Sequence, residues 1–204
     1  LVEVAYEALP AVTDTAAAVA PDAPLVWPQV PRNVAVDYRA GEVAATDAAF
    51  ARSAHRVRLA LVSNRVMGVP MEPIAAIGDY HAGEGRYTLH CPSQGVHVVR
   101  KVLAEEVLHV PAWALRVVTG DVGGGFGVRV FAIPEHALVL WAARRIGRPV
   151  KWVAERAETM LVDTHARDHV TEAELALDAE GRFLALRVET IAALGAYLSA
   201  DGRD

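Results

Sequence analysis

The sequence predicts an α+β fold, in which strands and helices are mixed along one chain. Three observations support this prediction. Hydrophobic residues make up 53% of the 204 residues, which is enough to bury a sizeable core. Several segments alternate apolar and polar residues, as half-buried strands do. Others repeat apolar residues at helical spacing, as amphipathic helices do.

The N-terminal quarter predicts short elements around a proline-rich connector. Residues 20–33 are rich in proline, which removes a backbone donor and fixes φ, so we expect an extended connector and a domain boundary there. Asp14 or Thr15 is expected to cap a short helix. The elements predicted here are, in order, a strand over residues 1–7, a helix over 14–21, a strand over 33–41 and a helix over 42–54.

The rest of the chain alternates strand and helix patterns. The predicted order is a strand over residues 55–66, two strands joined by a glycine-rich turn over 75–91, a helix over 95–110, a strand over 115–121, a helix from Pro134 to Ile146, a strand over 148–155 and a hairpin over 170–197. The hairpin is expected to turn at residues 178–182, where the chain reads "DAEGR".

Composition restricts the classes of function. The formal net charge is −5, which argues against nucleic acid or an anionic membrane surface as the main partner. No apolar run approaches the length of about 20 residues that a membrane span needs. Cys91 is the single cysteine, so no internal disulfide can form, and we expect it to be a buried structural residue.

The stretch "DVGGGFGVR" (Asp121–Arg129) places four glycines in nine residues between a predicted strand and a predicted helix. A tight strand-to-helix turn would explain it, and so would a loop that offers bare N–H groups to an anion or cofactor. It matches neither a Walker A loop nor the G-x-G-x-x-G dinucleotide pattern. Phe126 is expected to pack onto a ligand or a second loop, because an aromatic ring is costly to expose.

The stretch "CPSQGVHVVR" (Cys91–Arg100) predicts the start of a helix, with Ser93 as a plausible cap. Gln94 carries an amide that both donates and accepts hydrogen bonds, so it is a candidate binding residue. We expect the glycine cluster and Gln94 to face a common cleft, within the roughly 15 Å that one small-molecule pocket spans. If the Ser93 cap alone orders this turn, Gln94→Ala should leave thermal stability almost unchanged.

Two further segments are interpreted as structural, without a catalytic or metal-binding role. Glu72 lies between Met71 and Pro73, and we expect a structural ion pair there rather than a catalytic base. The stretch "DTHARDH" (163–169) has no standard zinc spacing, so we expect a solvated loop that orders its neighbours by hydrogen bonds.

Several segments, in this order, closely resemble the large subunit of the molybdenum hydroxylases, the xanthine dehydrogenase, aldehyde oxidase and carbon monoxide dehydrogenase superfamily. They are "NRVMGVPMEP", "YTLHCPSQGVHVVRKVLA", "VVTGDVGGGFGVR", "IPEHALVLWAARRIGRPVKWVAERAETMLVDTHARDH" and "ELALDAEGRFLALRV". The resemblance covers almost the whole chain but only an inner part of a family member. It implies residues 1–20 as the end of an α/β hammerhead-type domain, 21–33 as the linker, and 34–204 as the N-terminal part of the first molybdopterin-binding domain.

The resemblance also implies site residues. Gln94 matches a family glutamine that hydrogen-bonds an oxo ligand of the metal, and Phe126 matches a phenylalanine whose backbone contacts the molybdenum–pterin cofactor. The full set of implied cofactor-binding residues is Gln94, Gly95, Gly124, Gly125, Phe126 and Gly127. The catalytic base is a glutamate expected beyond Asp204, so no catalytic residue or metal ligand is expected in this chain, and neither Glu72 nor Glu135 takes that role. Val130 stands where purine-oxidising members have a substrate-binding glutamate, and Cys91 is not at the position of the special cysteine of carbon monoxide dehydrogenases.

The implied protein oxidises an aldehyde, an aromatic heterocycle or CO, with water as the oxygen source. Its cofactor is the molybdenum–pterin group, with the cytosine dinucleotide form as one possibility, and iron–sulfur clusters and FAD lie on partner subunits. A dimer of heterotrimers in the cytoplasm, with the periplasm as the alternative, would act on a small-molecule substrate. The 204 residues alone are expected to be inactive. Two other classes remain open: a non-catalytic binding or structural piece, and a nucleotide-binding domain that uses the glycine loop for phosphate.

Overall fold

The computed structural model describes residues 3–197 and divides them into two compact units. One unit comprises residues 3–65 and 167–197, and the other comprises residues 66–166. This division differs from the expected boundaries near residues 20 and 33, which stay predictions. The α+β class is confirmed, because both units combine helices with strands, and the larger sheet of the second unit is mixed.

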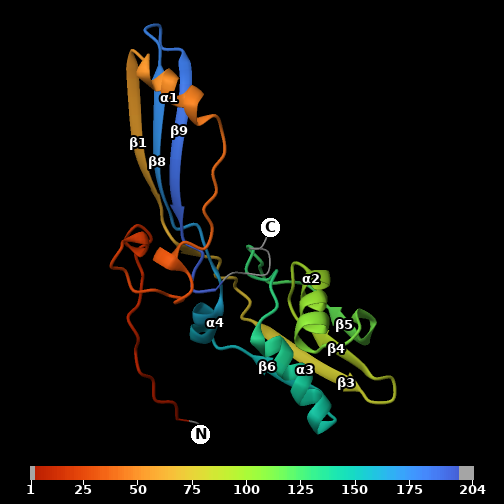
Figure 1. The fold of residues 1–204 in the computed structure, drawn as a ribbon. Helices are drawn as coiled ribbons and strands as arrows, with labels where there is room; N and C mark the ends of the chain where they lie inside the picture. The colour runs from red at the N-terminus through yellow and green to blue at the C-terminus, as the bar shows by residue number, and fades with distance from the viewer. Residues whose placement is uncertain (1–2, 198–204) are drawn as a thin grey trace. The chain divides into compact units, whose positions relative to one another are not determined.

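The first unit is built on a three-stranded antiparallel sheet with the strand order β1-β8-β9 and with α1 along one face (Figure 1). The elements are α1 (Val43–Ala51), β1 (His55–Ser63), β8 (His169–Leu177) and β9 (Phe183–Ala192). The face beneath α1 is the charged one: Arg187 forms an ion pair with Asp47 and lies 4.5 Å from the centre of the Phe50 ring. The opposite face is apolar and open, with Leu59 53% and Leu186 61% exposed.

The N-terminal segment corrects several predictions. No strand forms over residues 3–7 or 33–41, and the remaining residues 1–2 lie outside the described part of the chain. A strand needs a partner for its backbone groups, and these segments find none, so Tyr6 is 89% and Tyr38 83% exposed.

The predicted helix over 14–21 shrinks to the 3-10 turn η1 (Ala17–Val19), where the Asp14 carboxylate accepts the N–H of Ala17 at 2.6 Å. The proline-rich stretch is folded rather than extended. It contains the 3-10 turn η2 (Pro31–Asn33), whose Asn33 amide donates to the carbonyls of Ala18 and Pro24. Side-chain hydrogen bonds therefore replace the backbone donors that the prolines lack.

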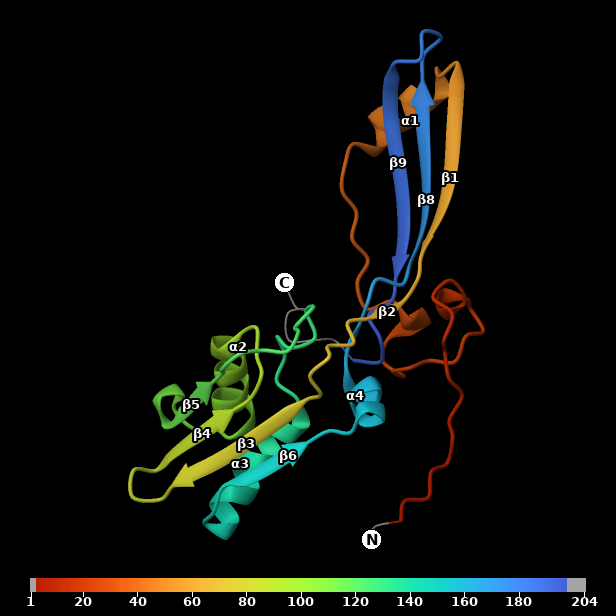
Figure 2. The same cartoon turned by 180° about the vertical axis from the view of Figure 1, so that it is seen from behind.

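The second unit contains a four-stranded sheet with the order β5-β4-β3-β6 (Figure 2). Its strands are β3 (Ala75–His81), β4 (Arg86–His90), β5 (Leu115–Val118) and β6 (Val150–Val153), and its helices are α2 (Val96–Lys101), the π-helical turn η3 (Val102–Val107) and α3 (Pro134–Ile146). The β4–β5 pair is parallel and the other two pairs are antiparallel. These strands and helices confirm the predicted order from residue 75 to residue 155.

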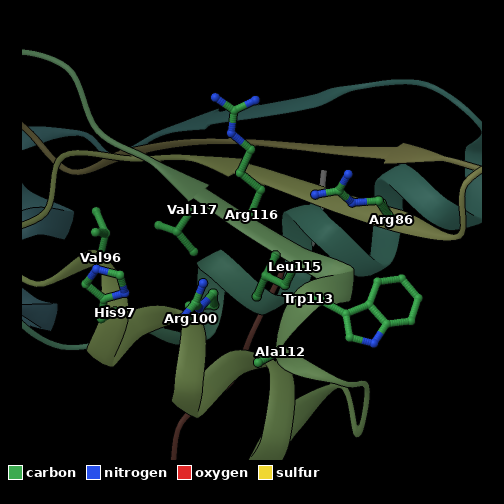
Figure 3. Close-up of a pocket in the computed structure, with 9 residues that line it drawn as sticks. All are labelled: Arg86, Val96, His97, Arg100, Ala112, Trp113, Leu115, Arg116 and Val117. Atoms are coloured by element: carbon green, nitrogen blue, oxygen red, sulfur yellow. The ribbon is translucent and has the colours of Figure 1, made fainter.

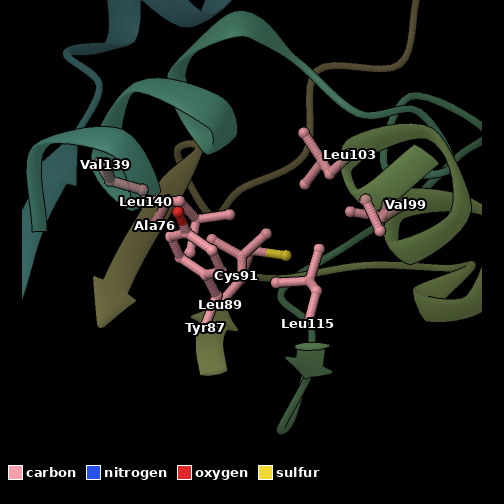
Figure 4. Packing of buried hydrophobic residues seen from close by; sticks show 10 residues of the cluster. Ala76, Tyr87, Leu89, Cys91, Val99, Leu103, Leu115, Val139 and Leu140 are labelled. Atoms are coloured by element: carbon pink, nitrogen blue, oxygen red, sulfur yellow. The ribbon is translucent and has the colours of Figure 1, made fainter. Parts of the chain in front are cut away.

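The core of this unit lies between the sheet and its helices, as Figure 4 shows. Leu89 of β4, Val99 of α2, Leu103 of η3 and Leu140 of α3 are each 0–1% exposed and belong to one cluster. Cys91 is 6% exposed in the same cluster, and burial raises the pKa of its thiol to about 11. The prediction of a buried cysteine is confirmed, and a thiol with that pKa is hardly ever ionised near neutrality.

Four short elements of the second unit have no counterpart in the sequence prediction. They are β2 (Val66–Met67), β7 (His165–Ala166), the 3-10 turn η4 (Ala112–Ala114) and α4 (Arg156–Val162). β2 and β7 pair with each other as a two-stranded sheet. α4 is the most consequential of the four, since its two ends support the candidate site described below.

Gly78 lets α3 lie directly on β3, and a Gly78→Ala substitution is expected to destabilise the protein. A Cβ at Gly78 would lie 2.5 Å from the carbonyl carbon of Val139, an atom of the α3 backbone that cannot rotate away. Overpacking of this kind costs about 1–3 kcal/mol. Denaturant unfolding checks the loss, with Gly83→Ala as the control, because a Cβ at Gly83 would meet only the His81 side chain at 3.4 Å. Equal stability of Gly78→Ala and the parent would contradict this account of the packing.

Candidate functional site

The glycine loop and the segment before α2 meet in the structure. The loop, residues 120–127, runs between β5 and α3, and Gln94 immediately precedes Gly95, the N-cap of α2. A Cβ at Gly125 would lie only 2.3 Å from Cδ of Gln94. The two segments therefore lie well within 15 Å of each other, as expected, while the common cleft expected between them stays a prediction.

Gln94 holds the glycine loop through its side-chain oxygen. Oε1 accepts hydrogen bonds from the backbone N–H groups of Gly127 at 2.9 Å and Arg129 at 3.3 Å. The backbone N–H of Gln94 donates in turn to the carbonyl of Arg129 at 3.0 Å. Two donors on one atom fix the orientation of the amide, because the group that faces them must be the oxygen. The N–H groups of the amide take no part in these two contacts, and Gln94 is exposed.

Backbone conformation and close contacts within the protein explain why glycine is needed in the loop. Gly124 and Gly127 have φ values of +110° and +89°, which residues with a Cβ rarely adopt. A Cβ at Gly123 would lie 2.5 Å from Cβ of Glu72. Close approach to a cofactor is thus not needed to explain these glycines, and that role stays a prediction. Phe126 also has a positive φ of 50°, and its ring is not buried on a second loop, because the residue is 72% exposed.

Glu72 binds the other end of the loop, at Gly123, by two hydrogen bonds. Its Oε2 accepts the N–H of Gly123 at 2.8 Å, and its backbone N–H donates to the carbonyl of Gly123 at 3.1 Å. The predicted ion pair is therefore wrong: the carboxylate of Glu72 binds a backbone donor. Ser93 also differs from expectation, since its hydroxyl accepts the N–H of Gly95 at 3.0 Å and Gly95 itself is the N-cap.

A buried ion pair lies on the interior side of the loop and helps to hold it. Arg129 and Asp163 meet at 2.7 Å, with side chains only 3% and 2% exposed. Arg129 also donates to the carbonyl of Glu72 at 3.2 Å, while Arg156 donates to the carbonyls of Pro70 and Met71 at 2.7 and 2.5 Å. The stretch "DTHARDH" orders its neighbours as predicted, but the expectation of a solvated loop fails at Asp163, which is buried.

His136 lies near Arg129, and its imidazole ring is neutral at neutral pH. Burial, and then the charge of Arg129, lower the pKa of His136 to about 4. Its Nδ1 accepts the N–H of Ile133 at 3.3 Å, so the neutral ring carries its proton on Nε2. That Nε2 is buried without a hydrogen-bond partner, as are Nε of Arg129 and Oδ2 of Asp163.

The depressed pKa of His136 makes stability depend on pH. The unfolded state binds a proton below about pH 6.5 and the folded state only near pH 4, so stability falls as the pH drops through this interval. The loss should reach about 3 kcal/mol at 1.36 kcal/mol per pKa unit. His136→Gln keeps an acceptor for Ile133 but does not titrate. Denaturant unfolding at pH 6.5 and 4.5 should give a smaller difference for this variant, and parallel pH profiles would contradict the buried neutral ring.

Two cavities of the second unit do not reach Gln94 or residues 123–127. One, of about 230 Å³, opens at the start of the glycine loop beside Glu72, Asp121 and Lys151. The other, also about 230 Å³, lies between α2, η4 and β5 and is lined by Arg86, His97, Arg100, Arg116, Trp113 and apolar neighbours. Figure 3 shows the guanidinium groups of Arg100 and Arg116 lying apart. Their charges do not converge on one point in this cavity.

The structure brings together all of the predicted cofactor-binding residues, and Val130 lies beside them. The predicted residues are Gln94, Gly95, Gly124, Gly125, Phe126 and Gly127. A Cβ at Gly95 would lie 3.8 Å from Cγ1 of Val130, which places the valine next to the start of α2. Sequence reasoning missed the supporting Arg129, Asp163 and Arg156, because nothing local in the sequence indicates which distant partner a charged residue will find. Within residues 3–197, no cluster of His, Cys, Asp or Glu side chains could hold a metal ion.

Comparisons with known proteins bear on this geometry. A family model described as the molybdopterin cofactor-binding domain matches residues 26–203. The carbon monoxide dehydrogenase large chain of Hydrogenophaga pseudoflava is 35% identical over 208 residues, covering 96% of this chain and 26% of that protein. The 6-hydroxypseudooxynicotine dehydrogenase complex subunit gamma of Paenarthrobacter nicotinovorans is 36% identical over 198 residues, covering 97% of this chain and 24% of that protein.

The fold is shared with a solved enzyme. The reconstituted CO dehydrogenase from Oligotropha carboxidovorans matches with a TM-score of 0.81 at 31% identity, covering 92% of this chain and 25% of that one. The chain thus spans about a quarter of the length of the relatives it matches. Among the described residues, no helix is both long and apolar enough to cross a membrane.

Proposed function

The chain belongs to the molybdopterin cofactor-binding domain family, and from this premise we propose that it is part of a molybdenum-dependent hydroxylase large subunit. The whole protein would oxidise an aldehyde, an aromatic heterocycle or CO, with water as the oxygen source. One observation carries the proposal furthest: the oxygen of Gln94 is engaged by the loop, so this exposed residue has only its amide N–H donors left to offer to a ligand.

The residues present fit the molybdenum–pterin cofactor. A neutral amide can donate to an oxygen of the group without competing as a metal ligand. The group brings its own metal ligands, which suits a site without a metal-holding cluster among residues 3–197. Gln94, Gly95, Gly124, Gly125, Phe126 and Gly127 would hold the cofactor. When bound, it would supply the redox chemistry that removes an electron pair from the substrate.

This chain's own residues would bind and orient. Gln94 would donate through its amide nitrogen, while Glu72 and Gln94 keep both ends of the glycine loop in place. The base that moves a proton would be a glutamate beyond Asp204. Val130 offers no hydrogen bond beside the site, which disfavours a purine substrate.

The remaining features of the proposal concern the whole protein. Electrons would pass to iron–sulfur clusters and FAD on partner subunits, in a dimer of heterotrimers located in the cytoplasm. The pterin would be the cytosine dinucleotide form. The relatives support the multisubunit part, since one is a large chain and the other is a subunit of a complex.

The nucleotide-binding alternative is disfavoured by the contacts of the loop. The N–H groups of Gly123 and Gly127 are engaged by Glu72 and Gln94, so they do not offer a bare cradle to phosphate.

Metal and pterin analysis of the full-length parent tests the proposal. We expect molybdenum and a fluorescent oxidised pterin in amounts close to one per large subunit, and little molybdenum after growth on tungstate. Bound nucleotide without molybdenum would support the nucleotide-binding alternative, and neither group would support a structural role.

A further inference from the structure

Resting on the proposed function, we propose that Arg129 and Asp163 are positioning residues for the cofactor site. They hold the glycine loop against Gln94 and thereby aim the Gln94 amide donors. Neither residue touches the cofactor in this proposal. Each acts through the backbone of the loop.

The first step is the position of Arg129 in the chain. Its backbone is bound on both sides by Gln94, since its N–H donates to Oε1 and its carbonyl accepts the Gln94 N–H. Its side chain turns in the opposite sense, into the protein, where it is 3% exposed. Arg129 therefore links the Gln94 contact directly to the interior.

The second step is what the guanidinium reaches. One nitrogen donates to Asp163 at 2.7 Å and another donates to the carbonyl of Glu72 at 3.2 Å. Asp163 is the C-cap of α4, and Glu72 binds Gly123 at the far end of the loop. One side chain thus connects both ends of the glycine loop to a helix. A shift of Arg129 would therefore disturb the Gln94 contact at one end and the Glu72 contact at the other.

The third step concerns energy. A buried ion pair is weak evidence for stability, because the cost of removing two charges from water offsets their attraction. Here the pair is also imperfectly satisfied, since Nε of Arg129 and Oδ2 of Asp163 lack hydrogen-bond partners. An apolar pair would hold the core at least as well. What an apolar pair could not supply is the directional bond to the Glu72 carbonyl.

The test separates positioning from stability in the full-length parent protein. Arg129→Met with Asp163→Leu replaces the pair by apolar side chains, which is often neutral for stability. We expect an unchanged melting temperature, but amide hydrogen exchange about 10-fold faster or more, confined to residues 121–131. Molybdenum content should fall with it. Exchange is measured on protein grown on tungstate as well, so this readout does not depend on molybdenum.

Matched variants complete the design. Glu172→Gln breaks an exposed ion pair with Arg58 and should change neither exchange in residues 121–131 nor molybdenum content. Asp163→Asn serves if the double variant does not fold; it lowers overall stability because a buried charge is left unpaired, and exchange in residues 121–131 should rise by more than in the rest of the protein. Unchanged exchange and metal content in a folded variant would overturn this inference, and so would uniformly faster exchange across the whole protein with a lowered melting temperature. Absence of molybdenum from the unsubstituted parent would instead overturn the proposed function.

Discussion

Gly125→Ala in the full-length parent protein is expected to lower turnover by about 10- to 100-fold. A Cβ at this position would lie 2.3 Å from Cδ of Gln94 and 2.6 Å from its Oε1, so one of the two residues has to move. Gln94 is the side chain that can rotate, and rotation breaks its bonds to Gly127 and Arg129. The amide donor then leaves the site, and a hydrogen bond to a charged group is worth about 1.5–3 kcal/mol. At 1.36 kcal/mol per decade, that loss gives the stated range.

The loop provides its own control for this steric argument. A Cβ at Gly120 would meet nothing within 4 Å, so Gly120→Ala should keep the rate of the parent. A double-mutant cycle adds a sharper check. If Gly125→Ala acts by displacing Gln94, its effect should nearly vanish in a Gln94→Ala background. Additive losses, or a normal rate for Gly125→Ala at equal molybdenum content, would show that the clash is relieved without moving the amide.

The elements with local signals could be predicted from the sequence. The helix from Pro134 to Ile146 is the best case. Proline at its first position fits a helix start, and Gly147 ends it with φ +64°. The strand predicted over residues 33–41 failed for the opposite reason. Its alternating pattern is genuine, but a strand also needs a neighbouring strand, which no local pattern can guarantee.

The proximity of the candidate residues was predictable from the sequence, but the contacts that support them were not. The glycine cluster and Gln94 stand out in the sequence, and the structure brings them together. Their support depends on Arg129 finding Asp163, 34 positions along the chain, at the end of a helix that periodicity did not indicate. The contacts of the Gln94 oxygen are equally invisible in the sequence, because they depend on how the chain brings Gly127 and Arg129 to it.

Gln94→Glu should therefore behave differently from Gln94→Ala. A glutamate has the same shape and keeps an oxygen for the N–H groups of Gly127 and Arg129, so the loop stays anchored. It loses the amide donors and adds a negative charge where a partly charged oxygen of the cofactor is expected. Turnover should fall by about 100-fold or more, since a lost bond of about 1.5–3 kcal/mol is joined by repulsion. The melting temperature should stay near that of the parent.

Gln94→Ala removes both functions of the side chain, and this revises the expectation that its stability would be unchanged. Two backbone donors lose their acceptor, which costs about 0.5–1.5 kcal/mol each where water does not replace it. Stability and turnover should then fall together, whereas in Gln94→Glu only turnover falls. Melting temperature, molybdenum content and steady-state rate, measured on all three proteins, distinguish the two functions. A Gln94→Glu protein with full activity would remove the amide donor from the mechanism, because the one property that this substitution takes away is the ability to donate.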